Sequence, residues 1–272
     1  MRFASIAALV VVLLSACDVS EEQEVAFGRE NAQRINEALP LVTDPRATGY
    51  LTELGRSIAS RTSRGDLEWH FAIVNSDEVN AFALPGGYIY VNRGLIARAE
   101  RLEQLAGVLG HEIGHVVERH SVEQMKKTTG TNVAVTVICA VTSLCESGLS
   151  QVAISVAGNA ILARYSRGDE IEADSQAVVN VINAGIHPSG VPEFFEELLR
   201  ERNRNPNLFD TFFASHPVEE SRVDYTQRLI AAYDAAQLND LVSDDPRYRE
   251  FRAVIQSLPP PPASPPRQLP TQ

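Results

Sequence analysis

The segment LAGVLGHEIGHVVERH, residues 105–120, is the natural starting point for understanding this chain. Within and just before it, apolar residues recur at helical spacing and predict a helix with one buried side. These residues are Leu102, Leu105, Leu109, Ile113 and Val116. His111 and His115 lie about 40° apart on such a helix, opposite its apolar side. We therefore expect the helix to bury its apolar side and to leave both histidines accessible.

The two histidines belong to the motif H-E-x-x-H, in which Glu112 follows the first histidine. A single helix can offer both imidazoles of this motif to one zinc ion. The carboxylate of Glu112 would then lie beside the metal, where it can take a proton from a water molecule and return it later. The alternative is a chance occurrence of the motif on a solvated helix.

Three glycines, Gly107, Gly110 and Gly114, form a strip without side chains on the same helix. A glycine inside a helix is less favourable than an alanine by about 1 kcal/mol, so three of them need a compensating reason. The strip predicts that the backbone of another segment approaches this helix closely.

The same helix does not supply a third zinc ligand. Glu118 and Ser121 stand where the extended pattern H-E-x-x-H-x-x-G-x-x-H needs Gly and His, which excludes that class of site. His120 follows His111 by nine residues, about 180° around a continuous helix. We therefore expect His120 to be a surface residue that does not bind the same ion.

Acidic residues further along the chain are the candidates for the third ligand, and the best lie in residues 166–185, SRGDEIEADSQAVVNVINAG. On a helical wheel, Glu170 and Asp174 share the apolar side of this segment, whereas Glu172 faces water. Two unpaired buried carboxylates would be costly, but a metal and a ligating histidine would satisfy both. We predict that Glu170 binds zinc and that Asp174 orients a histidine ring. The alternative is that both acids pair with arginines at the edge of the helix.

The composition is that of an ordinary globular protein. The chain has 272 residues, of which 44% are hydrophobic and 22% charged. Its formal net charge is −11 and it contains no run of Lys or Arg, which argues against nucleic acid as a partner.

Residues 1–16 have the features of a lipoprotein signal peptide. Arg2 precedes an apolar run, residues 3–14, that is too short to cross a bilayer comfortably. The following tetrapeptide, LSAC at residues 14–17, resembles a bacterial lipobox, in which Cys17 becomes lipid-modified after cleavage. This predicts a periplasmic protein that is lipid-anchored to the inner or the outer membrane. The alternative is a plain secretory signal with an incidental cysteine.

Once Cys17 is lipidated, two cysteines remain, and we predict that Cys139 and Cys145 form a disulfide in an exported chain. The alternative is a pair of buried thiols. The apolar residues 133–163 are interrupted by polar residues and predict a buried helical pair. Residues 258–272 are proline-rich and predict a disordered tail, which leaves residues 17–257 as one domain.

The remaining patterns predict an α+β domain that is mainly helical, with a small sheet beside the metal helix. Helices are expected at residues 21–38, 46–60, 193–202 and 218–236, and strands at residues 67–74 and twice within residues 80–92. The last two strands flank Pro85-Gly86-Gly87. Such a hairpin could hold an extended peptide as an added strand, or it could be an ordinary part of the sheet.

Taken together, these residues resemble zinc metallopeptidases of the M48 family, the HtpX-like and CAAX-prenyl-protease-like enzymes. The resemblance rests on four segments that occur in order. They are NAFALPGGYIYVNRGL at 80–95, HEIGH at 111–115, YSRGDEIEAD at 165–174, and Ser215-His216-Pro217 with Arg222 six residues after the histidine. It implies a zincin-type domain in which His111, His115 and Glu170 hold one zinc ion and Glu112 is the general base.

The resemblance also implies that His216 and Arg222 line the active site. They would either stabilise the oxyanion or, as in some periplasmic members, block the metal in a latent form. The implied function is a zinc endopeptidase of the bacterial envelope that degrades misfolded or misassembled envelope proteins, with extended or unfolded polypeptides as substrates. The alternative is a zinc-stabilised periplasmic chaperone or assembly factor with latent or no proteolysis, which would bind partners in envelope assembly.

Overall fold

The structure is a computed structural model, and it describes residues 19–129, 165–202, 204, 210–217 and 219–261. The helices are α1 (Glu21–Ala38), α2 (Pro45–Ala59), α3 (Arg93–Arg98), α4 (Leu102–Val117), α5 (His120–Thr129), α8 (Arg167–Asn183), α9 (Gly190–Arg202), α10 (Asp210–Ser215), α11 (Glu220–Ala231), α12 (Ala235–Leu238) and α13 (Pro246–Ser257). The strands are β1 (His70–Val74), β2 (Ala81–Leu84) and β3 (Tyr88–Asn92). The expected mainly helical α+β domain is confirmed.

The three strands form one sheet in the order β1-β3-β2. Strand β1 runs parallel to β3, with His70 opposite Tyr88, and β2 runs antiparallel to β3, with Ala81 opposite Val91. The predicted hairpin around Pro85-Gly86-Gly87 is confirmed, and both glycines adopt the positive φ that such a tight turn requires. The strand predicted from residue 67 begins only at His70.

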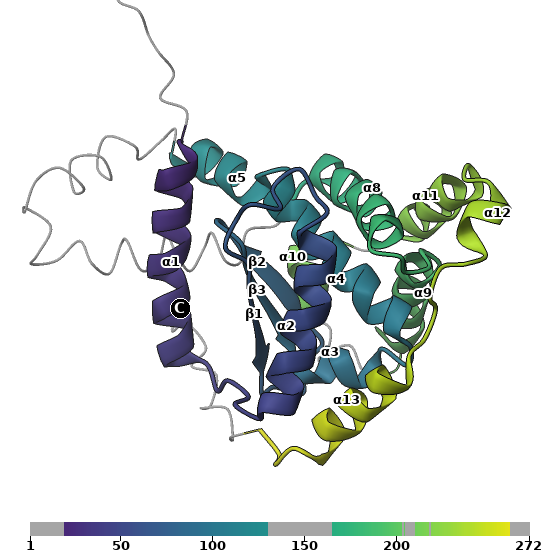
Figure 1. The fold of residues 1–272 in the computed structure, drawn as a ribbon. Helices are drawn as coiled ribbons and strands as arrows, with labels where there is room; N and C mark the ends of the chain where they lie inside the picture. Colours follow the sequence, from purple (N-terminus) through teal and green to yellow (C-terminus); the bar gives the residue numbers. More distant parts are fainter. Residues whose placement is uncertain (1–18, 130–164, 203, 205–209, 218, 262–272) are drawn as a thin grey trace, which may run out of the picture.

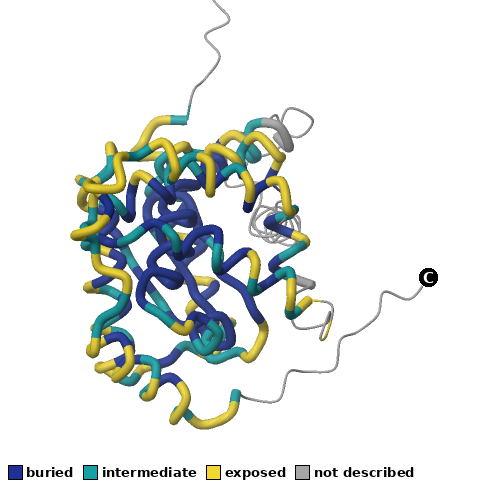
Figure 2. The backbone as a smooth tube through the Cα atoms, turned by 90° about the vertical axis from the view of Figure 1, so that its right-hand side faces the viewer, coloured by how far each residue is buried: buried dark blue, intermediate teal, exposed yellow. Residues whose placement is uncertain are grey.

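Helices cover both faces of the sheet (Figure 1). Apolar residues of α2 and α4 pack on one face, against Ile73, Ile89 and Val91. Helix α1 packs on the other face, where Ala32 and Ile35 meet Val74, Leu84 and Tyr90. The alternation of side chains along each strand explains why neighbouring residues belong to different clusters. Figure 2 shows the buried backbone gathered at the centre of the domain.

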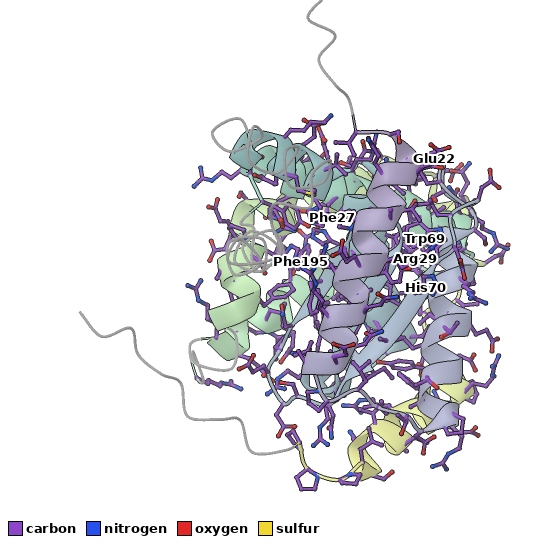
Figure 3. The ribbon with its side chains drawn as sticks, turned by 90° about the vertical axis from the view of Figure 1, so that its left-hand side faces the viewer. Glu22, Phe27, Arg29, Trp69, His70 and Phe195 are labelled. Atoms are coloured by element: carbon purple, nitrogen blue, oxygen red, sulfur yellow. The ribbon has the colours of Figure 1, made fainter. Side chains whose placement is uncertain are left out.

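Helix α1 is fixed in place by a buried acid. Glu24, which is 1% exposed, accepts hydrogen bonds from Arg64 Nη1 at 2.7 Å, Arg119 Nε at 2.8 Å and the Gly86 amide at 3.2 Å. Figure 3 shows α1 lying across the face of the sheet opposite α2 and α4, near His70. Because a buried carboxylate is stable only with such partners, the position of α1 is tied to the end of α4 and to the β2–β3 turn.

The predicted close approach to the glycine strip of α4 is also confirmed. A Cβ atom on Gly107 would lie 3.1 Å from the Val191 Cα atom of α9, and one on Gly110 or Gly114 would lie 3.2 or 3.0 Å from carbonyl oxygens of α8. Helices α4 and α8 therefore pack with their backbones unusually near each other. This approach brings side chains from both helices to one point.

The structure corrects two expectations about helices. The helix predicted over residues 218–236 is divided, because α11 ends at Ala231 and the side chain of Asp234 caps a separate helix α12. Helix α13 was not predicted, although Asp245 caps it and Pro246 begins it. Its residues Tyr248 and Phe251 are buried against α2.

Several predictions concern residues that the structure does not describe. These are the signal peptide at 1–16, the lipid site Cys17, the pair Cys139 and Cys145, the helical pair at 133–163, and most of the tail at 258–272. They stay predictions. Within the described part of the chain, no helix combines the length and the apolar character needed to cross a bilayer.

Candidate metal centre

The site forms where α4 and α8 cross. His111 and His115 extend from α4, and Glu170 extends from the first turn of α8, which a capping box of Ser166 and Asp169 fixes. The His111 and His115 Nε2 atoms lie 3.0 Å apart. Glu170 Oε2 lies 3.6 Å from His111 Nε2, and Glu170 Oε1 lies 3.5 Å from His115 Nε2. The three predicted ligands therefore meet at one buried point.

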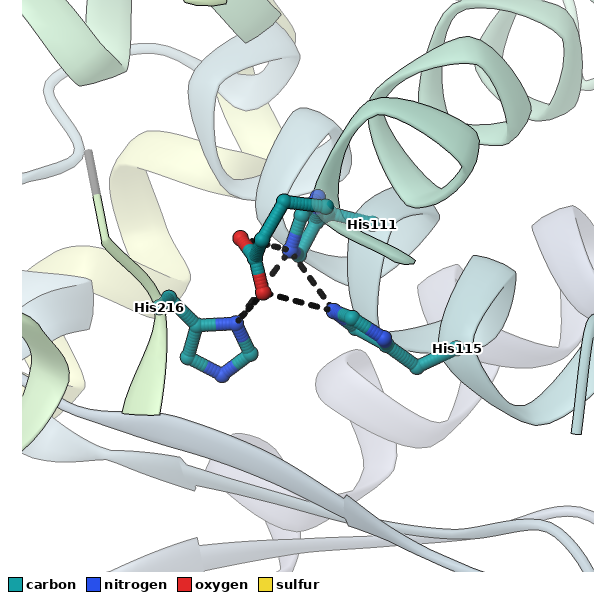
Figure 4. A group of neighbouring side chains, drawn as sticks. His111, His115 and His216 are labelled. Carbon is teal, nitrogen blue, oxygen red and sulfur yellow. Dashed lines mark hydrogen bonds and ion pairs between the residues drawn. The ribbon is translucent and has the colours of Figure 1, made fainter. Parts of the chain in front are cut away.

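A third imidazole joins this group from the opposite side. His216, just after α10, has its Nδ1 atom 3.1 Å from Glu170 Oε1 and 3.4 Å from His111 Nε2. One ligand atom from each of His111, His115, Glu170 and His216 lies within 4.8 Å of all the others. Figure 4 shows His111 and His115, both from α4, converging with His216, which comes from a separate segment of the chain.

These separations fit a tetrahedral metal ion. Zinc binds nitrogen at about 2.0–2.1 Å, so neighbouring ligand atoms of a tetrahedron lie about 3.3 Å apart. Five of the six separations lie at 3.0–3.6 Å, around this value, and the sixth, between His115 and His216, is within 4.8 Å. Two imidazoles and a carboxylate are also the donor set of many catalytic zinc sites. The residues present therefore fit the zinc ion that the motif predicts.

Glu112 lies beside this cluster and is fully buried. Its Oε1 atom lies 3.6 Å from His216 Nε2, and neither of its carboxylate oxygens has a hydrogen-bond partner among the described residues. Burial raises the pKa of this carboxyl group above its ordinary value, although His216 and His111 oppose the shift. A carboxylate in this state is a strong proton acceptor.

Asp174 and Arg222 contact two members of the cluster, His111 and Glu170. Asp174 Oδ1 lies 3.0 Å from His111 Nδ1, the ring atom at which an orienting carboxylate would act, although the geometry is not that of a hydrogen bond. Arg222 donates to both oxygens of Asp174, at 2.7 Å each, and also contacts Glu170. Glu170 and Asp174 therefore do pair with an arginine, but this residue is Arg222 of α11. Arg167, at the edge of α8, pairs with Glu219.

The surroundings set the charges of the ligands. Burial opposes ionisation of Glu170, but His216, His115 and Arg222 outweigh it and hold the pKa of this carboxyl group well below its ordinary value. Burial also lowers the pKa of His115 far below 6.5, so its imidazole is neutral at pH 7. An ionised carboxylate and a neutral imidazole are the forms that bind a metal.

Two expectations about exposure are wrong. The histidine side of α4 is buried, with His111 and His115 at 2% and 1% exposure, because α8, α9 and the His216 segment cover it. His120 is also buried and does not lie on the surface. Its Nδ1 atom lies 2.9 Å from His115 Nδ1. This contact is possible because α4 ends at Val117 and the chain turns before His120.

Sequence reasoning also gave no role to Tyr165, although it begins the segment that contains Glu170. Its ring stacks on His115 with a centroid distance of 3.8 Å, and its hydroxyl lies 2.9 Å from Ser121 Oγ. Tyr165 therefore restrains the imidazole of His115 from one face. The contact joins residues fifty positions apart, so no local pattern indicated it.

An H-E-x-x-H helix crossing a second helix that supplies a buried glutamate defines a zincin-type metallopeptidase domain. Comparison with known proteins agrees, and the chain belongs to peptidase family M48, whose family model matches residues 45–230. Zinc is the metal of this family.

Named relatives come from bacteria and from mitochondria. The chain is 30% identical over 211 residues to a beta-barrel assembly-enhancing protease of Escherichia coli O157:H7, an alignment that covers 74% of this chain and 42% of the relative. It is 34% identical over 165 residues to the metalloprotease YcaL of Escherichia coli K12, covering 60% and 63%. It is 28% identical over 211 residues to the mitochondrial metalloendopeptidase OMA1 of Schizosaccharomyces pombe, covering 78% and 60%. The chain thus spans about two fifths of the assembly-enhancing proteases that it matches.

The buried position of Glu112 predicts that this residue destabilises the metal-free protein at neutral pH. Burial raises the pKa of the Glu112 carboxyl group in the folded protein above 4.5, its value in the unfolded chain. At pH values between these two pKa values, Glu112 is protonated in the folded protein and ionised in the unfolded chain. Stability therefore falls as pH rises above about 4.5, and Glu112→Gln should remove this loss. Thermal melting after chelation should show a higher melting temperature for the variant at pH 7 and equal values below pH 4.

The matched control is Glu37→Gln, the same substitution at an exposed position of α1. It should leave the melting temperature unchanged at both pH values. Equal melting temperatures of Glu112→Gln and the wild type at pH 7 would contradict the expected charge burial.

Proposed function

We propose that this protein is a zinc-dependent endopeptidase of the bacterial cell envelope. In this proposal His111, His115 and Glu170 hold the zinc ion, and Glu112 is the general base. The observation that carries the proposal is the buried carboxylate of Glu112, which has no hydrogen bond among the described residues and lies beside four converging ligand atoms. A purely structural metal site would have no use for such a group, since burying it is costly.

The chemistry follows from the placement of these groups. Zinc, when bound, supplies a Lewis acid that polarises a peptide carbonyl and makes water more acidic. Glu112 takes a proton from the attacking water and passes it to the leaving amine. Asp174 keeps the ring of His111 in place, and Arg222 neutralises Glu170 and Asp174 from behind. Arg222 is therefore committed to these acids, so among the residues implied to stabilise the oxyanion we favour His216.

The sheet offers a place for an extended polypeptide. Strand β2 is at the edge of the sheet and packs against α4. Its outer backbone groups would pair with a substrate segment as an additional strand. Unfolded or misassembled proteins expose such extended segments, whereas folded proteins do not. The proposed substrates are therefore misfolded or misassembled envelope proteins.

The envelope location rests on the sequence and on the relatives. The lipobox-like residues 14–17 favour a lipid anchor at Cys17, and several relatives bear the name beta-barrel assembly-enhancing protease. We infer a periplasmic protein held at a bacterial membrane by its lipid, with partners among the proteins that assemble the envelope.

A second candidate function is a zinc-stabilised chaperone or assembly factor with latent proteolysis. The observation that favours it is the position of His216, which occupies a fourth ligand site in a buried cluster. A metal that holds four protein ligands has no open position for a substrate. In this state His216 acts as a latch, and the protein binds its clients without cutting them.

The endopeptidase proposal predicts that Glu112→Gln retains zinc but loses proteolysis. With casein or an unfolded envelope protein as substrate, kcat/KM should fall by at least about 10²-fold, the usual contribution of a general base. Zinc content, measured by mass spectrometry, should stay at one ion per chain. Glu37→Gln is the control and should cleave like the wild type. Equal cleavage by wild type and Glu112→Gln would remove Glu112 from the mechanism.

The latch predicts that His216→Ala increases the rate of peptide cleavage. If the latched form makes up about nine tenths of the protein, its removal raises the rate by up to about tenfold. Steady-state kinetics with a short fluorogenic peptide measures this change. A lower kcat with unchanged KM would instead show that His216 assists catalysis. If the wild type and His216→Ala both retain zinc and neither cleaves the peptide, the result would favour the chaperone function.

The lipid anchor predicts a processing step that globomycin blocks. In cells that express the full chain, this inhibitor of lipoprotein signal peptidase should cause the unprocessed precursor to accumulate, because cleavage before Cys17 requires that enzyme. Gel mobility and metabolic labelling with a fatty acid measure the two forms. Normal processing in the presence of globomycin would show a plain secretory signal.

A further inference from the structure

A row of three side chains leads from the metal cluster to the surface. His115 directs Nε2 toward the other ligands and Nδ1 toward His120, whose Nδ1 atom lies 2.9 Å away. The other nitrogen of His120, Nε2, lies 3.1 Å from Glu172 Oε2. His120 is 3% exposed, whereas the side chain of Glu172 is 64% exposed. None of these contacts was needed for the mechanism described above.

We propose that His120, held by Glu172, is a positioning residue that fixes the ring of His115 for zinc. The inference rests on the proposed zinc site and extends it to residues outside the ligand set. It also gives a task to an imidazole that would otherwise be an unexplained buried polar group.

The order of hydrogen bonds in the row supports this role. A ligand that offers its Nε2 lone pair to a metal carries its proton on Nδ1. His115 therefore donates from Nδ1, and His120 must accept at its own Nδ1 with no proton there. The proton of His120 is then on Nε2, whose hydrogen-bond partner among the described residues is Glu172. With the Nε2 atom of His115 offered to zinc, the hydrogen bonds of the whole row are therefore consistent with one another.

The two ligating histidines are thus supported in different ways. His111 has a carboxylate, Asp174, directly at its Nδ1 atom. His115 reaches its carboxylate through an intervening imidazole, because the exposed Glu172 contacts His120. Helix α8 therefore supplies an acid for each ligating histidine in addition to Glu170. Ligating histidines commonly need such partners to fix their orientation and tautomer.

A turn in the backbone makes the contact possible. On a continuous helix His120 would lie about 180° from His111. Arg119 instead has φ of 58°, a left-handed conformation that costs a non-glycine residue on the order of 1 kcal/mol. The Arg119 side chain is held by Glu24 at 2.8 Å and by the Val19 carbonyl at 2.6 Å. Helix α1 thus stabilises the turn that brings His120 back to the site.

The test is the zinc affinity of variants in the Glu112→Gln background, which prevents self-cleavage. Competition with a chromophoric chelator at fixed pH gives the dissociation constant. His120→Ala should bind zinc about 10- to 100-fold more weakly, as is usual when the partner of a ligating histidine is lost. His120→Asn should recover most of this affinity, because its Oδ1 atom can accept the hydrogen bond from His115. Glu172→Ala should give an intermediate value.

The matched control is His70→Asn, the same substitution at a half-exposed histidine in β1. It should leave the dissociation constant unchanged. Melting temperatures of the metal-free variants separate positioning from general support of the fold. The proposal predicts that His120→Ala and His120→Asn melt at similar temperatures without metal while differing in zinc affinity.

Two results would overturn the proposal. One is a dissociation constant of His120→Ala equal to that of the parent. The other is weaker binding by His120→Ala and His120→Asn alike, in step with lower melting temperatures, which would show a structural role only. If His120→Ala does not fold, the comparison of His120→Asn and Glu172→Ala with the parent decides. A parent that binds no zinc would instead refute the proposed zinc site itself.

Discussion

The close packing of α4 against α8 is the constraint on which the site depends. His111 and His115 are fixed relative to each other by one turn of α4, but Glu170 belongs to a helix that begins fifty residues later. The glycines of α4 let the backbone of α8 come into contact with the backbone of α4. A side chain at these positions would push the helices apart, and Glu170 would no longer reach the imidazoles. The glycine strip, although it has no chemistry of its own, sets the size of the metal site.

The charges of the site point to the same conclusion. Glu112, Glu170 and Asp174 are fully or almost fully buried. The guanidinium of Arg222 contacts Glu170 and Asp174. Arg222 alone cannot balance three ionised carboxylates. Burial lowers the pKa of His216, but Glu170 and Glu112 outweigh it and raise that pKa, so this imidazole can supply a second positive charge, and a divalent cation would add two more when bound. Burial of excess charge is among the most costly features that a protein interior can have. A bound metal ion would therefore stabilise the domain, and under the proposed mechanism the burial of Glu112 is the part of this cost that serves catalysis.

The sequence predicted what is local and missed what depends on distant contacts. Helical periodicity was sufficient to place His111, His115, Glu170 and Asp174 on the correct faces, because those faces are properties of single helices. The same reasoning failed for His120, since it assumed a helix that continues through Arg119. Burial of the histidine face could not be foreseen either, because it is produced by residues that come fifty to a hundred positions later. Only the resemblance to a family drew attention to His216 and Arg222.

The most direct measurement of the central claim is X-ray absorption spectroscopy of the zinc-loaded protein. The proposed site predicts one zinc ion per chain with nitrogen and oxygen neighbours at about 2.0–2.1 Å and the scattering pattern of imidazole rings. Replacing Glu170 by alanine should remove one oxygen neighbour from this shell. Sulfur neighbours at about 2.3 Å would contradict the account, because they would place the metal on cysteines and away from α4 and α8.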